Sequence, residues 1–207
     1  MSVYALGDLH LPGGQEKPME IFGANWDRHF DTIRERWLET VAETDTVLIP
    51  GDISWAMQLP DALEDLRAIG ALPGRKVLLR GNHDYWWSSL TKVREALPDG
   101  MYLVQNDSIE LPEALVAGSR GWMLPTPQQP LSAEDEKIFR RELLRLEMSL
   151  QHARRKQSPK PLIVMLHYPP LYADGLATPV TALLEQYAVD WVVYGHLHGQ
   201  GIKNGYN

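Results

Sequence analysis

Short apolar runs recur along the chain, and segments with helical spacing separate them. Seven runs are rich in leucine or β-branched residues and end at Gly, Pro or a polar residue, which predicts buried strands. They lie at residues 3–6, 46–50, 76–79, 101–104, 114–118, 162–166 and 190–195. Apolar residues at helical spacing predict helices at 26–41 and 63–69, the second ended by Pro73 and Gly74. This alternation of strands and helices predicts an α/β fold.

The segment at residues 119–160 has a different pattern. Three prolines in residues 124–130 prevent regular strand pairing, so this stretch is a predicted loop. Ser132, with Asp135 three residues later, is placed to cap a helix through residues 137–157. We interpret this loop and helix as an insertion in a single domain that spans residues 1–207. The basic residues of the helix are typical of a solvated face, and a cover over a substrate is the alternative.

Composition is that of an ordinary globular protein. The chain has 207 residues, of which 44% are apolar and 23% charged, enough for one domain with a substantial core. Its net charge of −7 argues against a general nucleic-acid-binding surface, without excluding a locally positive cleft.

Other features of the sequence narrow the chemistry and the compartment. There is no cysteine, which removes disulfides, thiolate nucleophiles and Cys-based zinc sites. The N-terminus lacks a basic start and a long apolar stretch, so we expect no signal peptide. No apolar run is long enough to span a membrane. We therefore expect a cytoplasmic enzyme or binding protein, and the sequence leaves its oligomeric state open.

Five of the predicted strands end in Asp, Asn or His. In an open α/β sheet the carboxyl ends of the strands line the ligand crevice, so we expect these side chains to meet there. They are Asp8 and His10 in "GDLH", Asp52 in "GDIS", Asn82 and His83 in "GNHD", His167 in "MLHYPP", and His196 and His198 in "GHLHG".

These side chains suit metal binding. Asp8 and His10 are two residues apart, as are His196 and His198, and in extended chain such pairs point to the same side. Carboxylate, amide oxygen and imidazole together favour manganese, iron or zinc over calcium, and several histidines make magnesium less suitable. Without His83 there are seven candidate ligands, too many for one tetrahedral zinc but suited to two ions that share a carboxylate.

Each motif by itself also has a purely structural interpretation. A histidine after a strand is more often a hydrogen-bonded structural residue than a ligand, and Asn-His-Asp is compatible with a simple Asx turn. Only the joint pattern favours a metal site. By contrast, His29 and His152 lie in helical segments without partners, and we interpret both as structural or solvated.

The five motifs, in this order, resemble the calcineurin-like metallophosphoesterase superfamily over residues 8–198. The resemblance implies two packed mixed β-sheets flanked by helices, a four-layer sandwich with a di-metal site at the strand ends. It implies that one ion is held by Asp8, His10 and His198 and the other by Asn82, His167 and His196, with Asp52 bridging both. It also implies that His83 is the catalytic histidine. We interpret Asp84 as fixing the turn, with a direct catalytic role as the alternative.

The resemblance further implies hydrolysis of a phosphate ester by metal-bound hydroxide, with a phosphodiester favoured over a monoester. His83 would stabilise the phosphoryl charge or protonate the leaving oxygen. The alternative is a catalytically silent scaffold of the same fold that binds proteins. The presence of all seven ligands and of His83 favours the enzyme.

The substrate is left open by the sequence. "GDISWAM" lacks the further acidic and arginine residues of the protein Ser/Thr phosphatase branch. Aromatic residues beside the motifs either pack the core or form a rim for a base or a lipid; they are Trp55, Tyr85, Trp86, Trp87, Trp122 and Tyr168, together with Pro169. The family usually continues with more strand after "GHLHG", so we expect either a short second sheet or an incomplete stretch of a longer protein.

Overall fold

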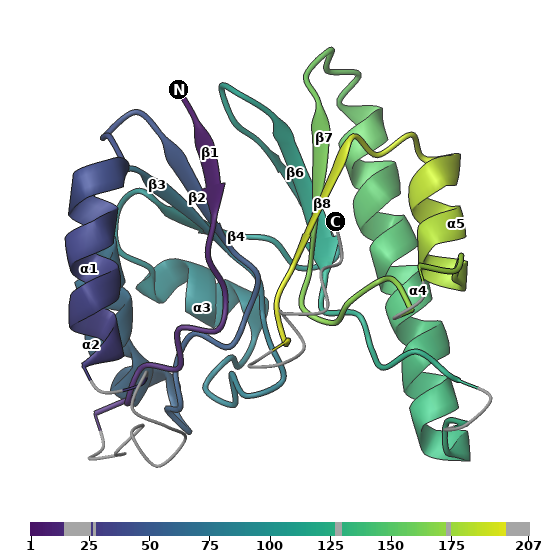
Figure 1. Ribbon diagram of the computed structural model, residues 1–207, viewed down its shortest axis with the longest axis horizontal. Coiled ribbons are helices and arrows are strands. Elements are labelled where there is room, and N and C mark those ends of the chain that lie inside the picture. The colour runs from purple at the N-terminus through teal and green to yellow at the C-terminus, as the bar shows by residue number, and fades with distance from the viewer. Residues whose placement is uncertain (15–25, 27, 127–129, 173–174, 198–207) are drawn as a thin grey trace.

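The computed structural model describes residues 1–14, 26, 28–126, 130–172 and 175–197. Within these residues strands and helices follow one another in an α/β order (Figure 1). The elements are β1 (Val3–Ala5), α1 (His29–Thr40), β2 (Thr46–Ile49), α2 (Leu59–Gly70), β3 (Arg75–Leu78), α3 (Leu90–Ala96), β4 (Met101–Leu103), β5 (Ser108–Glu110), β6 (Leu115–Ser119), α4 (Ala133–Arg155), β7 (Leu162–Leu166), α5 (Pro179–Gln186) and β8 (Trp191–Tyr194).

The strands form two four-stranded sheets that face each other. The first has the order β1-β2-β3-β4 and the second the order β5-β6-β7-β8. Helices α1 and α2 lie outside the first sheet, and α4 and α5 lie outside the second (Figure 1). The predicted α/β sandwich of two sheets is confirmed. Only the second sheet is mixed, because β5 runs antiparallel to β6, whereas every pairing in the first sheet is parallel.

The central strands β2, β3, β6 and β7 are buried on both faces, which explains why they are nearly continuous apolar runs. Leu48, Val77 and Leu79 of the first sheet pack against Val116 and Met165 of the second, and all five are at most 1% exposed. The outer faces form two further cores with the helices. A strand that is buried on both sides positions its carboxyl end firmly, and β2, β3 and β7 lead in this way to Asp52, Asn82 and His167.

All seven predicted strands are present, and β5 was missed because it is three residues long with a single apolar residue. The short helices α3 and α5 were also missed. Helix α4 begins as predicted, with the Ser132 side chain accepting a hydrogen bond from the Asp135 N–H at 3.1 Å. It connects the parallel neighbours β6 and β7, so it is the crossover helix of a β-α-β unit. The extent of the domain and the insertion at residues 119–160 stay predictions.

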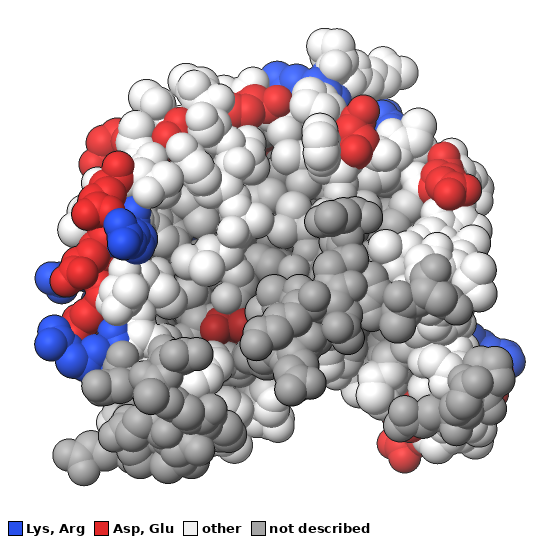
Figure 2. All heavy atoms as spheres, in the orientation of Figure 1, with Lys and Arg blue, Asp and Glu red and all other residues white. Residues whose placement is uncertain are grey.

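Charged side chains of both signs alternate over α1 on the face drawn in Figure 2. Ion pairs such as Arg36–Glu39, at 2.9 Å, are largely exposed and stabilise the fold little. Among the residues that the structure describes, no helix is both long and apolar enough to cross a membrane.

Candidate metal centre

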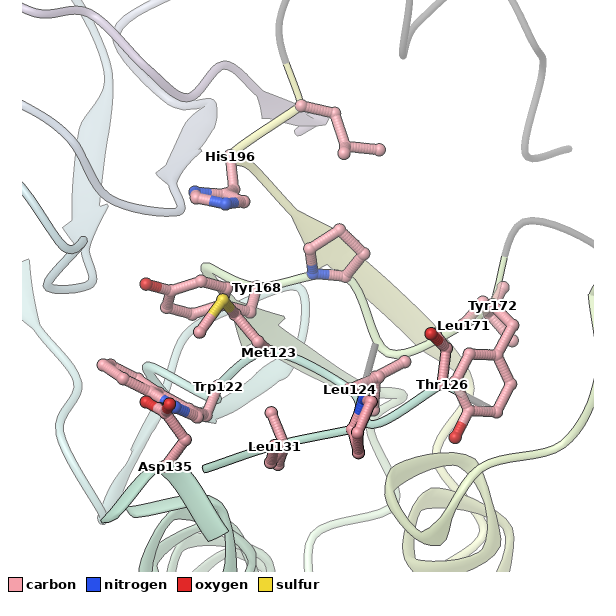
Figure 3. Close-up of a pocket in the computed structure, with 13 residues that line it drawn as sticks. Trp122, Met123, Leu124, Thr126, Leu131, Asp135, Tyr168, Leu171, Tyr172 and His196 are labelled. Carbon is pink, nitrogen blue, oxygen red and sulfur yellow. The ribbon is translucent and has the colours of Figure 1, made fainter. Parts of the chain in front are cut away.

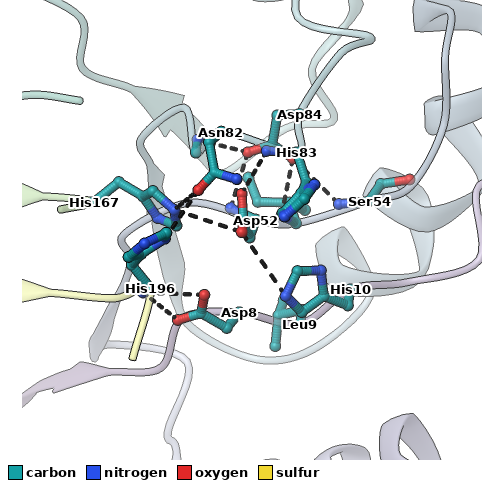
Figure 4. Close-up of polar contacts among 12 residues, drawn as sticks. Asp8, Leu9, His10, Asp52, Ser54, Asn82, His83, Asp84, His167 and His196 are labelled. Atoms are coloured by element: carbon teal, nitrogen blue, oxygen red, sulfur yellow. Dashed lines mark hydrogen bonds and ion pairs between the residues drawn. The ribbon is translucent and has the colours of Figure 1, made fainter. Parts of the chain in front are cut away.

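The polar strand ends of both sheets converge on one site (Figure 4). Asp8, Asp52 and Asn82 follow β1, β2 and β3 of the first sheet, and His167 and His196 follow β7 and β8 of the second. Residues that are up to 188 positions apart in the sequence thereby come into contact, as the hydrogen bonds between His196 and Asp8 show. His198 lies outside the described residues, and its place in the site stays a prediction.

Two groups of potential ligands share one carboxylate. Asp8, His10 and Asp52 form the first group, and Asp52, His167 and His196 form the second; within each group the ligand atoms lie within 4.8 Å of one another. Asp52 is 1% exposed, and its Oδ2 lies 3.8 Å from His10 Nε2 and 3.4 Å from His167 Nε2. Asp52 is thus placed between the two groups, with one histidine from each directed at the same oxygen.

The surroundings of His167 and Asn82 fit a cation. His167 Nδ1 lies 2.9 Å from the carbonyl of Pro50, which requires the ring proton on Nδ1. Burial lowers the pKa of His167, which favours the neutral ring with a lone pair on Nε2. That lone pair faces the Oδ1 of Asn82 at 2.7 Å, and the same oxygen lies 2.9 Å from His196 Nδ1. A positive ion between these electron-rich atoms would satisfy all of them.

The candidate ligands also have an unusual backbone. Asp8, His10, Asp52 and His196 adopt φ angles of 56°, 45°, 53° and 71°, in the left-handed region that non-glycine residues rarely occupy. Hydrogen bonds between the loops hold this conformation, because the N–H groups of Asp8 and His10 donate to the carbonyls of Gly51 and Asp52 at 3.0 and 2.9 Å. Such strain persists where the surrounding structure over-determines it, as at functional sites.

Gly81 and Gly195, each directly before a candidate ligand, leave room for the side chains of Asp52 and Asp8. A Cβ atom at Gly81 would overlap with the carboxylate and backbone of Asp52, and one at Gly195 would lie 2.7 Å from Asp8 Oδ2. Both contacts are closer than a carbon atom tolerates. The glycine in "GNHD" and the first glycine in "GHLHG" therefore allow the candidate ligands of neighbouring strands to approach.

Asp84 ties two of these loops together. Its fully buried carboxylate accepts hydrogen bonds from the N–H groups of Asp52, Ile53, Ser54 and Gly81 and from Trp86 Nε1, at 2.7–3.2 Å. Burial raises the pKa of Asp84, and the N–H donors oppose this by stabilising the carboxylate. The predicted role of Asp84 in fixing the turn is confirmed, and the turn it fixes includes the backbone on both sides of the site.

Comparison with known proteins identifies the family. A family model described as calcineurin-like phosphoesterase matches residues 1–200. The chain belongs to this family. It is a metal-dependent phosphoesterase, a phosphoric ester hydrolase, as the motifs predicted.

Two solved structures are similar to this phosphoesterase. A phosphopantetheinyl hydrolase from Mycobacterium tuberculosis is 16% identical with a TM-score of 0.51, over 95% of this chain and 82% of that chain. A protein of unknown function, AQ665 from Aquifex aeolicus, is 21% identical with a TM-score of 0.45, over 92% of this chain and 88% of that chain. The first likeness supports the fold alone. No curated protein matches the chain.

His83 lies beside the ligand groups of the phosphoesterase without joining them. Its backbone N–H donates to Asp52 Oδ1 at 2.8 Å, and its ring lies 4.5 Å from the Trp55 ring and 5.7 Å from the His10 ring. Its buried Nδ1 has no hydrogen-bond partner among the described residues. The catalytic role of His83 stays a prediction, and the position of the ring, next to both Asp52 and His10, is compatible with it.

The aromatic residues near the motifs divide into two sets. Trp86 and Trp87 are core residues whose indole N–H groups bond Asp84 and Gln105 at 3.0 and 2.8 Å. Trp55 instead stacks on the ring of His10 at 4.8 Å. Trp122, Tyr168 and Pro169 line a cavity beside His196. The core interpretation therefore holds for the tryptophans of "GNHDYWW", and the rim for a base or a lipid at the residues after β6 and β7 stays a prediction.

A second buried carboxylate, Asp65 on α2, was not expected from the sequence. It accepts hydrogen bonds from the N–H of Gly13 at 2.8 Å and from Ser54 Oγ at 2.5 Å, and so joins the loops after β1 and β2. The sequence held one indication of this role: Asp65 lies at helical spacing with the apolar residues Ala62, Leu66 and Ile69, which form the buried face of α2.

The two helical histidines are structural, as predicted. His29 Nε2 lies 2.8 Å from the carbonyl of Leu9, and His152 Nδ1 accepts from the N–H of Ser108 at 3.0 Å. Neither belongs to a ligand group among the described residues.

Proposed function

We propose that this phosphoesterase uses two divalent transition-metal ions and that Asp52 bridges them. The observation that carries the proposal is the carboxylate of Asp52, which belongs to both ligand groups. One ion would be held by Asp8, His10 and His198, and the other by Asn82, His167 and His196. The mixture of carboxylate, amide oxygen and imidazole favours manganese, iron or zinc over magnesium.

The ions would supply an activated water for attack on phosphorus and neutralise charge on the phosphoryl oxygens. The residues of the chain position these parts. Asp84 and Asp65 hold the loops that carry Asp52 and Asn82, and Trp55 supports the rings of His10 and His83. We propose that His83 donates a proton or a hydrogen bond to the phosphate ester as its charge develops.

We further propose that the enzyme prefers phosphodiesters to monoesters. A cavity of about 520 Å³ adjoins the site at His196, which leaves room for a second organic group on the phosphate. A monoester whose leaving group points away from this cavity would leave the space unused. The cytoplasmic location and the lack of a general nucleic-acid surface stay predictions.

Counting metal ions tests the dinuclear centre. Protein saturated separately with manganese, iron or zinc should contain two ions per chain by elemental analysis. Asp52→Asn should lower the occupancy of both sites, and His10→Ala should lower mainly one. His152→Ala is the matched control, because it removes a histidine outside the ligand groups, and it should keep both ions. One ion per wild-type chain at saturation would overturn the dinuclear proposal.

The diester preference has its own test. Bis(p-nitrophenyl) phosphate and p-nitrophenyl phosphate share a leaving group, so their kcat/KM values compare the diester with the monoester directly. We expect the diester to be the better substrate with each metal. A higher kcat/KM for the monoester would refute this part of the proposal and leave the metal centre untouched.

A further inference from the structure

The cavity beside His196 has the size of a ligand site, and Figure 3 shows the side chains that line it. Its volume is about 520 Å³, within the range of roughly 300–1,000 Å³ that is typical of small-molecule pockets. One wall comes from the loop between β6 and α4, and the opposite wall comes from the segment between β7 and α5. The cavity thus lies between two connections of the second sheet.

Both walls of this cavity carry apolar side chains beside polar ones. The first wall presents Met123, Leu124 and Leu131, and the second presents Leu171 and Tyr172. Met123 is 42% exposed, although it is a large apolar side chain. When an apolar ligand covers water-exposed apolar side chains around a cavity, the free energy of the system falls.

Few charged side chains line the cavity, and among the described residues they are negative. No lysine or arginine is among the lining residues that the structure describes, and the one carboxylate is Asp135. That carboxylate is already engaged, because it accepts hydrogen bonds from Trp122 Nε1 at 3.2 Å and from Ser132 Oγ at 2.6 Å. The nearby guanidinium of Arg120 lies over the Trp122 ring, 4.6 Å from its centre. A second anionic group on the ligand would therefore find no cationic partner among the described residues that line the cavity.

The cavity is continuous with the candidate metal centre. His196 belongs to a ligand group and also lines the cavity. The Tyr168 ring lies 4.4 Å from the His196 ring on one side and 5.3 Å from the Trp122 ring on the other. An organic group attached to a phosphate at the metal centre would enter the cavity along this aromatic edge.

We propose that this cavity binds an uncharged, apolar alkyl group of the substrate, on the ester oxygen that is not cleaved. The substrate class is then a phosphodiester with one alkyl substituent, and neither a polyphosphate nor a diester with a second anionic end. This inference rests on the proposed function, since it places the phosphate at the metal centre.

A series of p-nitrophenyl alkyl phosphates tests the substrate class. The leaving group stays the same, and the second substituent is methyl, butyl, hexyl or 5-carboxypentyl. We expect kcat/KM to rise by about fourfold for each added methylene until the cavity is filled. The 5-carboxypentyl ester should lose most of the gain of the hexyl ester, because its anionic end meets no cation. Equal values for methyl and hexyl, or a preference for the carboxylate, would overturn the proposal.

Charge-introducing variants locate the effect in the cavity. Met123→Glu and Leu171→Glu should lower kcat/KM for the hexyl ester by about tenfold or more and change the value for the methyl ester by less than about twofold. Their matched controls are Met148→Glu and Leu144→Glu, which replace exposed side chains of α4 outside the cavity. The controls should leave both values unchanged. If Met123→Glu and Leu171→Glu reduce both esters equally, the cavity is not the alkyl site.

A binding measurement separates this proposal from the proposed function. Titration of methyl hexylphosphonate, whose methoxide is a poor leaving group, should show tighter binding than methyl methylphosphonate by calorimetry, and Met123→Glu should abolish the difference. If wild-type protein hydrolyses all esters with equal kcat/KM and binds both phosphonates equally, only the alkyl site fails. If it binds no metal and turns over no ester but still favours the hexyl ligand, only the metal-centre proposal fails.

Discussion

Replacing the buried carboxylate of Asp84 by an amide should destabilise both the fold and the candidate metal centre. In the wild-type protein Oδ1 accepts from Ile53, Ser54 and Trp86, and Oδ2 accepts from Asp52 and Gly81. The amide of Asp84→Asn retains one acceptor oxygen. If this amide oxygen takes the position of Oδ1, it keeps the three hydrogen bonds from Ile53, Ser54 and Trp86. The NH₂ group then takes the position of Oδ2 and faces the N–H groups of Asp52 and Gly81. Two hydrogen bonds are lost, and two pairs of donors face each other.

The magnitude follows from these two lost bonds. A buried hydrogen bond to a charged group contributes about 1.5–3 kcal/mol, so the loss lies at about 3–6 kcal/mol. Asparagine also removes the cost of burying a charge, the same cost that raises the pKa of Asp84. We therefore expect a loss of unfolding free energy at the lower end of this range, about 3 kcal/mol. The total free energy of unfolding of a protein is about 5–15 kcal/mol. The variant should fold and lose a large part of its stability.

Urea unfolding of the metal-free proteins measures this loss, and elemental analysis measures the metal content. Asp190→Asn is the matched control, because the exposed Asp190 accepts one bond from the Leu162 N–H at 2.8 Å, which an amide oxygen can also accept. It should cost about 1 kcal/mol or less. If Asp84→Asn lowers the unfolding free energy no more than this control does, the hydrogen bonds to both carboxylate oxygens of Asp84 are not what holds the loops. If stability and metal content persist while activity disappears, Asp84 acts directly in the chemistry.

Three further predictions concern the site and the fold. His83→Ala should retain its metal ions and lose about 10²–10⁴-fold in kcat on esters with alkoxide leaving groups, and distinctly less on nitrophenyl esters, because only the alkoxide needs a proton; equal losses would exclude a role as the acid. Removing the ions with a chelator should lower the melting temperature, and manganese at about a hundredfold excess over its Kd should restore about 2.7 kcal/mol for each site; an unchanged melting temperature would contradict a folded-state metal site. Hydrogen bonds from the N–H groups of Ser2 and Ala42, at 2.7 and 3.0 Å, lower the pKa of Asp45 below 3.8. Asp45 therefore stabilises the fold above pH 3.8, and this contribution is lost as the pH falls through its folded-state pKa. Asp45→Asn should show a weaker decline of unfolding free energy with acidification, and an identical decline would refute this.

Much of the architecture could be predicted because local patterns in the chain reflect it. The central strands are short apolar runs because they are buried on two faces, and polar residues follow where they end. The candidate site could be predicted for the same reason: Asp8, Asp52, Asn82, His167 and His196 each follow a strand, and parallel strands deliver their carboxyl ends to one edge. The elements that escaped prediction are β5, α3 and α5, which are too short to show a period.

The sequence by itself therefore determined the kinds of element, their order and the chemical types of the candidate ligands. Only the tertiary structure decided which of these residues meet. The contact of Asp8 with His196 depends on two sheets packing face to face, and no local pattern contains that arrangement. The same holds for the buried carboxylates of Asp84 and Asp65 and for the cavity beside His196, whose walls come from two connections far apart in the chain. Strand pattern is a local consequence of burial, whereas the distances within a site depend on how separate elements pack.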